Sequence, residues 1–180
     1  MSTLKEKLKQ KISEKSEQRR HFIKGTRPTS IEFQIATWFG SGLIIPAPGT
    51  WGTVGGFVFG CLLMAATTPV ITFLMAIALT IVGYFAIRKI EGRFQEHDSS
   101  FIVIDEVIAI LFVLSLLPTF TPLFSVLGFI LFRIFDAVKP WPINWLDKQI
   151  GGATGVIVDD LMAGLYTLLI LWGIYGYGLI

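Results

Sequence analysis

Six carboxylates lie within or beside apolar segments of this chain, where charged side chains are rare. They are Asp98, Asp105, Glu106, Asp136, Asp159 and Asp160. A charged side chain in the hydrocarbon of a membrane costs about 2.5–3.5 kcal/mol on insertion scales. Carboxylates that persist in such surroundings usually face a polar cavity, a metal ion or a partner charge. We therefore take these six residues as the candidate catalytic set.

The residue types in this set favour a hard divalent cation. Carboxylate oxygens suit Mg²⁺ or Mn²⁺, whereas a chain with two His and one Cys is a poor zinc binder. Adjacent residues on a helix point about 100° apart, so one acid of each neighbouring pair could hold the metal while the other faces a second metal, a water or a basic side chain. The candidate metal ligands are Asp105, Glu106, Asp136, Asp159 and Asp160.

The alternative is that these acids are structural and form ion pairs with basic residues. The basic residues available for this are Arg88, Arg133, Lys139 and Lys148. One acidic pair alone would leave the two interpretations balanced. Two pairs together with Asp98 and Asp136 favour the metal site.

Arg133 and Lys139 are candidates for binding a phosphate beside the acidic set. Arg133 and Asp136 are three residues apart and would be neighbours on a helix. Arginine binds phosphate as a bidentate fork and lysine binds it as a point charge. The alternative is that both residues anchor a helix end at the cytoplasmic surface.

A Gly-rich segment from Pro48 to Gly56 provides a second candidate anion site. Such a loop at the start of a helix can direct backbone N–H groups toward an anion. We take Thr50, Gly52 and Thr53 as its phosphate-binding candidates. The segment matches neither a Walker A motif nor a dinucleotide fingerprint, and close helix packing would also explain its glycines.

The composition indicates an integral membrane protein. The 180 residues are 53% hydrophobic and 16% charged, compared with about 25% charged in soluble domains, and the mean hydropathy is +0.66. We predict an all-α polytopic fold with about five membrane-embedded helices. The predicted spans are residues 54–68, 70–87, 101–117, 123–135 and 156–177.

The positive-inside rule orients these helices. Lys and Arg occur in the N-terminal arm and in the 88–100 and 133–148 loops, which should be cytoplasmic. The turns at 68–70 and 118–122 carry no charge and should lie outside. All six carboxylates and the Gly/Pro loop at 40–53 then lie at the cytoplasmic ends of their helices.

Residues 1–30 form a basic arm before the membrane domain at 31–180. The arm contains nine Lys/Arg and three Glu, whereas residues 31–180 contain six Lys/Arg and ten Asp/Glu. We expect a weakly amphipathic cytoplasmic helix close to anionic lipid; a solvated or disordered tail is the alternative. Nucleic acid is a less suitable partner, because Phe22 is the only aromatic residue of the arm.

Four blocks of this chain resemble the phosphatidylglycerophosphatase A family. The blocks are Pro48-Gly49-Thr50-Trp51-Gly52-Thr53, Asp98-x3-Ile102-Val103-Ile104-Asp105-Glu106, Phe132-Arg133-x-Phe135-Asp136-x2-Lys139-Pro140-x-Pro142-Ile143 and Gly155-Val156-x-Val158-Asp159-Asp160-x2-Ala163-Gly164. The resemblance implies Mg²⁺-dependent hydrolysis of phosphatidylglycerophosphate to phosphatidylglycerol and phosphate, a step of phospholipid biosynthesis. It implies a multi-pass protein of the inner membrane whose active site faces the cytoplasm. The family's acidic motif residues correspond to the six carboxylates above.

Two other functions are weaker alternatives. A CDP-lipid phosphatidyltransferase would also use acids and Mg²⁺, but its Asp-Gly…Ala-Arg…Gly…Asp…Asp pattern is absent from the sequence. A cation transporter would need charges near the bilayer centre and access from both faces. The predicted crowding of the acids at one end favours an enzyme.

Overall fold

The computed structural model describes residues 2–94 and 99–178, and its regular structure in these ranges is helical. The helices are α1 (Ser2–Gly25), α2 (Ile31–Ala36), α3 (Pro48–Ala66), α4 (Pro69–Phe94), α5 (Ile104–Ser115), α6 (Pro122–Val138), α7 (Ile143–Gln149) and α8 (Gly152–Gly176), with a short 3₁₀ turn at Ser41–Leu43. No strand occurs in the described ranges. The all-α prediction is therefore confirmed.

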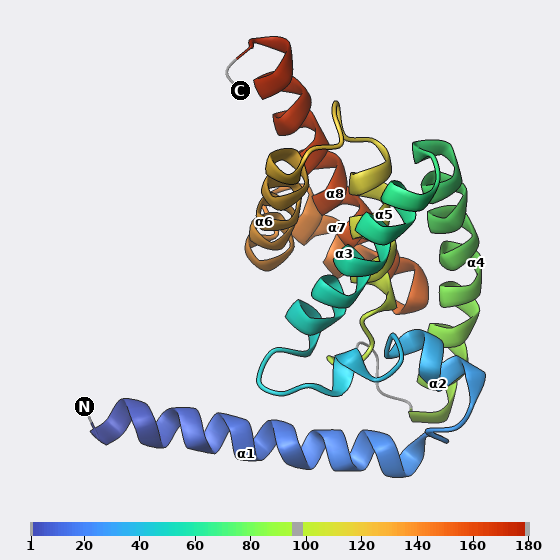
Figure 1. The fold of residues 1–180 in the computed structure, drawn as a ribbon. Coiled ribbons are helices and arrows are strands. Elements are labelled where there is room, and N and C mark those ends of the chain that lie inside the picture. The colour runs from blue at the N-terminus through green and yellow to red at the C-terminus, as the bar shows by residue number, and fades with distance from the viewer. Residues whose placement is uncertain (1, 95–98, 179–180) are drawn as a thin grey trace.

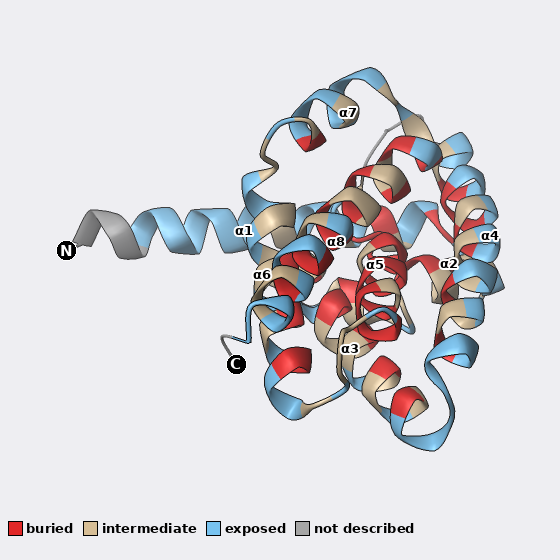
Figure 2. Ribbon diagram, turned by 90° about the horizontal axis from the view of Figure 1, so that it is seen from above, coloured by how far each residue is buried: buried red, intermediate tan, exposed pale blue. Residues whose placement is uncertain are grey.

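Helix α5 lies at the centre of the bundle. It packs against α3, α4 and α8, and α6 packs in turn against α8. Figure 2 shows α5 as an almost entirely buried helix surrounded by partly exposed ones. Ile108, Ala109 and Ile110 are consecutive, so their side chains point about 100° apart around the helix, and all three are fully buried. This is expected for an apolar helix that is packed against neighbours on every side.

In the part of the chain that the structure describes, three helices, rather than about five, are long and apolar enough to cross a membrane. They are α3, α4 as far as Arg93, and α8. The prediction of five spans was wrong for α5 and α6, which contain 12 and 17 residues. At 1.5 Å per residue these helices reach about 18 and 26 Å, less than the roughly 30 Å of a bilayer core. The side chains of α5 and α6 are therefore apolar partly because neighbouring helices bury them, and not only because they could contact lipid.

The outer face of α4 is apolar and exposed. Val70, Leu74, Ile81 and Phe85 are each more than half exposed. A contiguous apolar face of this kind is unfavourable in water and marks a surface that is covered by lipid or by another protein. Together with the lengths of α3, α4 and α8, it supports a membrane protein.

The predicted cytoplasmic loop at 88–100 begins later than expected, because α4 continues to Phe94. Lys89 and Arg93 therefore lie on the last turns of α4 and form ion pairs with Glu32 of α2, at 2.9 and 3.1 Å. The hydrogen bond from Lys89 lowers the pKa of Glu32. These contacts attach α2 to the end of α4.

The basic arm is a helix that lies across one end of the bundle. Figure 1 shows α1 running crosswise below α3 and α4, with its N-terminal half projecting beyond them. Its C-terminal end is held by Phe22, which is 3% exposed and packs against Phe33 and Phe101 with ring centroids 5.7 and 5.4 Å apart. The described part of the arm is therefore docked on the domain, not separate from it.

Candidate active site

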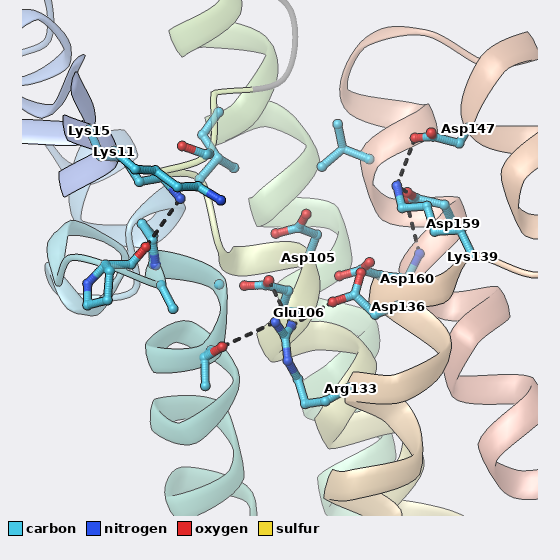
Figure 3. Close-up of a pocket in the computed structure, with 18 residues that line it drawn as sticks. Lys11, Lys15, Asp105, Glu106, Arg133, Asp136, Lys139, Asp147, Asp159 and Asp160 are labelled. Atoms are coloured by element: carbon cyan, nitrogen blue, oxygen red, sulfur yellow. Dashed lines mark hydrogen bonds and ion pairs between the residues drawn. The ribbon is translucent and has the colours of Figure 1, made fainter. Parts of the chain in front are cut away.

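A pocket of about 360 Å³ lies at the end of the bundle next to α1, which contributes part of its lining. Figure 3 shows its charged side chains converging from several helices. Five of the six predicted carboxylates line it: Asp105, Glu106, Asp136, Asp159 and Asp160. The sixth, Asp98, lies outside the described residues. The structure thus brings together acids that are up to 55 positions apart in the chain.

Three helices position these acids. Asp105 and Glu106 lie in the first turn of α5, which α3, α4 and α8 surround. Asp136 lies in the last turn of α6, and Asp159 and Asp160 lie about two turns after the start of α8. Because the start of α5, the start of α8 and the end of α6 meet at one depth, the acids share one pocket.

Arg133 on α6 connects three of the helices. Its Nη1 donates hydrogen bonds to Asp136 Oδ2 at 2.6 Å, Glu106 Oε1 at 3.1 Å and Thr53 Oγ1 at 3.2 Å. Its Nη2 donates to Thr50 Oγ1 at 3.3 Å. The planar guanidinium is therefore held in one orientation at the pocket wall.

Lys139 forms a second connection, between the end of α6 and α8. It is the C-cap residue of α6, and its Nζ donates hydrogen bonds to Asp159 Oδ2 and, at 2.9 Å, to Asp147 Oδ1 of α7. Partial burial acts to lower the pKa of the ammonium, but the bonds from both carboxylates outweigh burial and raise it. Lys139 therefore carries a positive charge at neutral pH.

These contacts account for part of the acidic set as ion pairs. The described ion pairs to the site acids come from Arg133 and Lys139, and not from Arg88 or Lys148. Asp105 and Asp160 have no basic partner among the described residues. The structural alternative thus applies to Glu106, Asp136 and Asp159, but it does not explain the other two acids.

Three carboxylate oxygens of the residues that line the pocket are buried without a hydrogen-bond partner among the described residues. They are Asp105 Oδ1, Glu106 Oε2 and Asp160 Oδ2. Asp105 and Asp160 are 9% and 4% exposed. An unpaired charge buried to this extent costs several kcal/mol, so these carboxyl groups need either a proton or a counter-charge such as a bound cation.

Mg²⁺ fits the chemistry of this donor set. All the nearby acidic ligands are hard oxygens, and three of those oxygens lack a partner. No three His, Cys, Asp or Glu side chains of the described residues already surround a single metal position. The residues that would hold the ion are those with unpartnered oxygens, Asp105, Glu106 and Asp160.

The Gly-rich segment contributes mainly close packing around Glu106. A Cβ atom on Gly49 would lie 2.0 Å from Glu106 Oε1, and one on Gly52 would lie 2.4 Å from Val103 Cβ. Thr50 lines the pocket, whereas Gly52 and Thr53 are buried and do not line it. The absence of side chains at Gly49 and Gly52 lets the first turns of α3 approach α5.

The pocket also contains charged residues that the sequence analysis missed. Asp147 lines it from α7, and Lys11 and Lys15 line it from α1. Asp147 lies eight residues after Lys139, a spacing that carries no specific signal. Lys11 and Lys15 are two of nine basic residues in the arm, and nothing in their spacing distinguishes them from the others.

Residues 34–175 match the family model described as phosphatidylglycerophosphatase A. A phosphatidylglycerophosphatase A from Haemophilus influenzae is 33% identical over 140 residues, covering 78% of this chain and 86% of that protein. One from Escherichia coli is 34% identical over 138 residues, covering 77% and 80%. A Bacteroides thetaiotaomicron protein, provisionally named a phosphatidylinositol-3-phosphatase, is 32% identical over 151 residues, covering 81% and 94%.

No solved structure shows a significant match to the chain. The family model nevertheless covers most of the chain, including α3 to α7 entirely and nearly all of α8. Its range contains every pocket residue contributed by the bundle, and α1 lies outside it. The chain belongs to the phosphatidylglycerophosphatase A family.

Proposed function

We propose that this protein is a Mg²⁺-dependent lipid phosphatase that hydrolyses phosphatidylglycerophosphate to phosphatidylglycerol and inorganic phosphate. Family membership supports a phosphoric monoester hydrolase with a phospholipid substrate. Neither a CDP-lipid phosphatidyltransferase nor a cation transporter is favoured by the relatives.

The observation that carries the metal dependence is the set of unpartnered oxygens on Asp105, Glu106 and Asp160. Arg133 and Lys139 are already engaged with other carboxylates. A phosphomonoester would bring about two further negative charges into this pocket. A divalent cation is the counter-charge that serves both the buried acids and the phosphate, because its coordination shell accepts protein and phosphate oxygens together.

The roles of the side chains follow from this arrangement. When bound, Mg²⁺ neutralises phosphate oxygens and lowers the pKa of a coordinated water. Asp105, Glu106, Asp136, Asp159 and Asp160 are the proposed ligands, and a carboxylate of this set accepts the proton of the attacking water. Arg133 and Lys139 donate hydrogen bonds to the equatorial oxygens, while Thr50 holds the Arg133 guanidinium in place.

The lipid would enter at the level of the headgroups. We propose that α3, α4 and α8 cross the inner membrane, that α5 and α6 are embedded among them, and that the pocket faces the cytoplasm. Lys and Arg gather at the pocket end, whereas the α3–α4 and α5–α6 turns at the other end carry no charge. A phosphate in the pocket would then be hydrolysed while the acyl chains stay in the bilayer.

Phosphate release by the purified protein tests the proposal. We expect rapid release from phosphatidylglycerophosphate in detergent micelles, complete loss with EDTA, and recovery with added Mg²⁺. Phosphatidylinositol 3-phosphate, phosphatidic acid and glycerol 3-phosphate complete the substrate panel. EDTA-resistant hydrolysis would exclude an essential exchangeable metal. Faster hydrolysis of phosphatidylinositol 3-phosphate than of phosphatidylglycerophosphate would contradict the proposed substrate and favour the one named for the Bacteroides relative.

A further inference from the structure

The pocket has two groups of cations that differ in what they contact. Arg133 and Lys139 each bind two carboxylates. Lys11 and Lys15 also line the pocket, yet neither forms an ion pair with a carboxylate among the described residues. Lys15 Nζ has one long hydrogen bond, to the carbonyl oxygen of Pro46 at 3.4 Å. Among the described residues, Lys11 and Lys15 are therefore the pocket cations whose charge is not already paired with a carboxylate.

The docking of α1 places these lysines at the pocket. Lys11 and Lys15 are four residues apart and lie on one face of the helix. Arg19, four residues further on the same face, donates a hydrogen bond to the carbonyl oxygen of Leu43 at 3.4 Å, and Phe22 is buried below it. Figure 3 shows both lysines reaching toward the pocket from the side opposite Lys139, with Asp105 and Glu106 between them.

The two arm lysines and the acidic cluster lie on different sides of the pocket. A ligand that carries two anionic groups could contact both. The proposed substrate has a phosphomonoester at one end of a glycerol and a phosphodiester at the other. The acidic side of the pocket suits the phosphomonoester and the metal, whereas a phosphodiester has one negative charge and no need for a metal. Two lysines without carboxylate partners can supply the complementary charge.

We propose that Lys11 and Lys15 bind the phosphodiester of the lipid headgroup, and so make the basic arm part of the substrate site. The inference rests on the proposed function. It makes α1 a specificity element, because a lipid with a phosphomonoester but no phosphodiester would gain nothing from these lysines. The arm lies outside the region matched by the family model, so the match itself does not account for this contribution.

Binding of phosphatidylglycerol tests the inference without any hydrolysis. This lipid has the phosphodiester and lacks the phosphomonoester. Short-chain phosphatidylglycerol is titrated onto the full-length protein in neutral-detergent micelles with EDTA. These micelles contain no other anionic lipid, which separates binding in the pocket from general attraction of the arm to a charged membrane. We expect the Kd to rise about tenfold or more in the K11Q/K15Q variant, and less in K11R/K15R, which keeps both charges.

A matched control removes two charges from the opposite face of α1. Lys9 and Arg20 are exposed and do not line the pocket, so K9Q/R20Q should leave the Kd within twofold of the wild type. The inference is overturned if wild type binds phosphatidylglycerol no more tightly than K11Q/K15Q, or if K9Q/R20Q weakens binding equally.

Kinetics provide a second readout. In K11Q/K15Q the KM for phosphatidylglycerophosphate should rise about tenfold with little change in kcat, while any hydrolysis of phosphatidic acid should be unaffected. An equal loss on both substrates would contradict a role in binding the phosphodiester. Failure of the wild type to release phosphate would contradict the proposed function instead, and the phosphatidylglycerol titration would still decide the role of the lysines.

Discussion

Two halves of the pocket differ in how their negative charge is balanced. On one side, Glu106, Asp136 and Asp159 are held by Arg133 and Lys139. On the other, Asp105 and Asp160 are buried with no basic partner among the described residues, and each has an oxygen without a hydrogen bond. Each acid of the first half has a basic partner in the protein, whereas the acids of the second half need a proton or a bound cation.

This difference separates a structural role from a functional one within a single acidic cluster. A buried ion pair adds little net stability, but loss of one partner leaves an uncompensated charge. The acids that are paired with Arg133 and Lys139, here called the tethered acids, therefore keep these two basic side chains in position. The acids without a basic partner, here called the untethered acids, leave oxygens available to bind a cation. Substitutions in the two halves should change stability in opposite directions.

The largest effect is expected in the untethered half. The D105N and D160N variants should each lower phosphate release at least about 100-fold, equivalent to roughly 3 kcal/mol of transition-state stabilisation. In EDTA, each should also unfold at a higher temperature than the wild type, because a buried charge without a partner has been removed. Thermal unfolding in detergent measures the second effect.

Added Mg²⁺ should affect the stability of the wild type and of these two variants differently. Added Mg²⁺ should raise the unfolding temperature of the wild type, since a ligand that binds only the folded state stabilises it. The shift should be small or absent in D105N and D160N. A wild-type rate in either variant would remove that residue from the proposed site.

A substitution in the tethered half should act in the other direction on stability. K139Q leaves Asp159, whose side chain is 5% exposed, without its basic partner. We expect the free energy of unfolding to fall by about 1–3 kcal/mol, less than for a fully buried pair because Lys139 itself is 30% exposed. The double variant K139Q/D159N should recover part of this loss, and the double-mutant cycle measures the coupling.

The smallest effect on the rate concerns the packing that holds Glu106 beside Arg133. G52A would place a Cβ 2.4 Å from Val103 Cβ and 2.9 Å from Glu106 Oε2, which should cost about 1–3 kcal/mol of stability and reduce the rate about tenfold. The control is G92A on α4, where nothing lies within 4 Å of the new atom. That variant should be neutral or slightly stabilising. Equal behaviour of G52A and G92A would contradict the close approach of α3 to Glu106.

Much of the fold and of the site follows from local sequence. Long apolar segments predicted the helices α3, α4 and α8, because a helix satisfies its own backbone hydrogen bonds in lipid. The acids of α5, α6 and α8 stood out because carboxylates are costly in apolar surroundings. The distribution of Lys and Arg in the connecting segments predicted that these acids lie at one end of the bundle, through the positive-inside rule.

Other features depend on contacts between segments that are distant in the chain. Apolarity alone does not distinguish a helix that faces lipid from one that faces protein. The sequence therefore predicts a membrane span at α5, which is in fact a short central helix. Nor does residue type separate the paired acid Glu106 from its unpaired neighbour Asp105. Only the positions of Arg133 and Lys139 decide which carboxylates are balanced, since a charge interaction depends on distance in space. Only the docking of α1 through Phe22 brings Lys11 and Lys15, among many similar lysines, to the pocket.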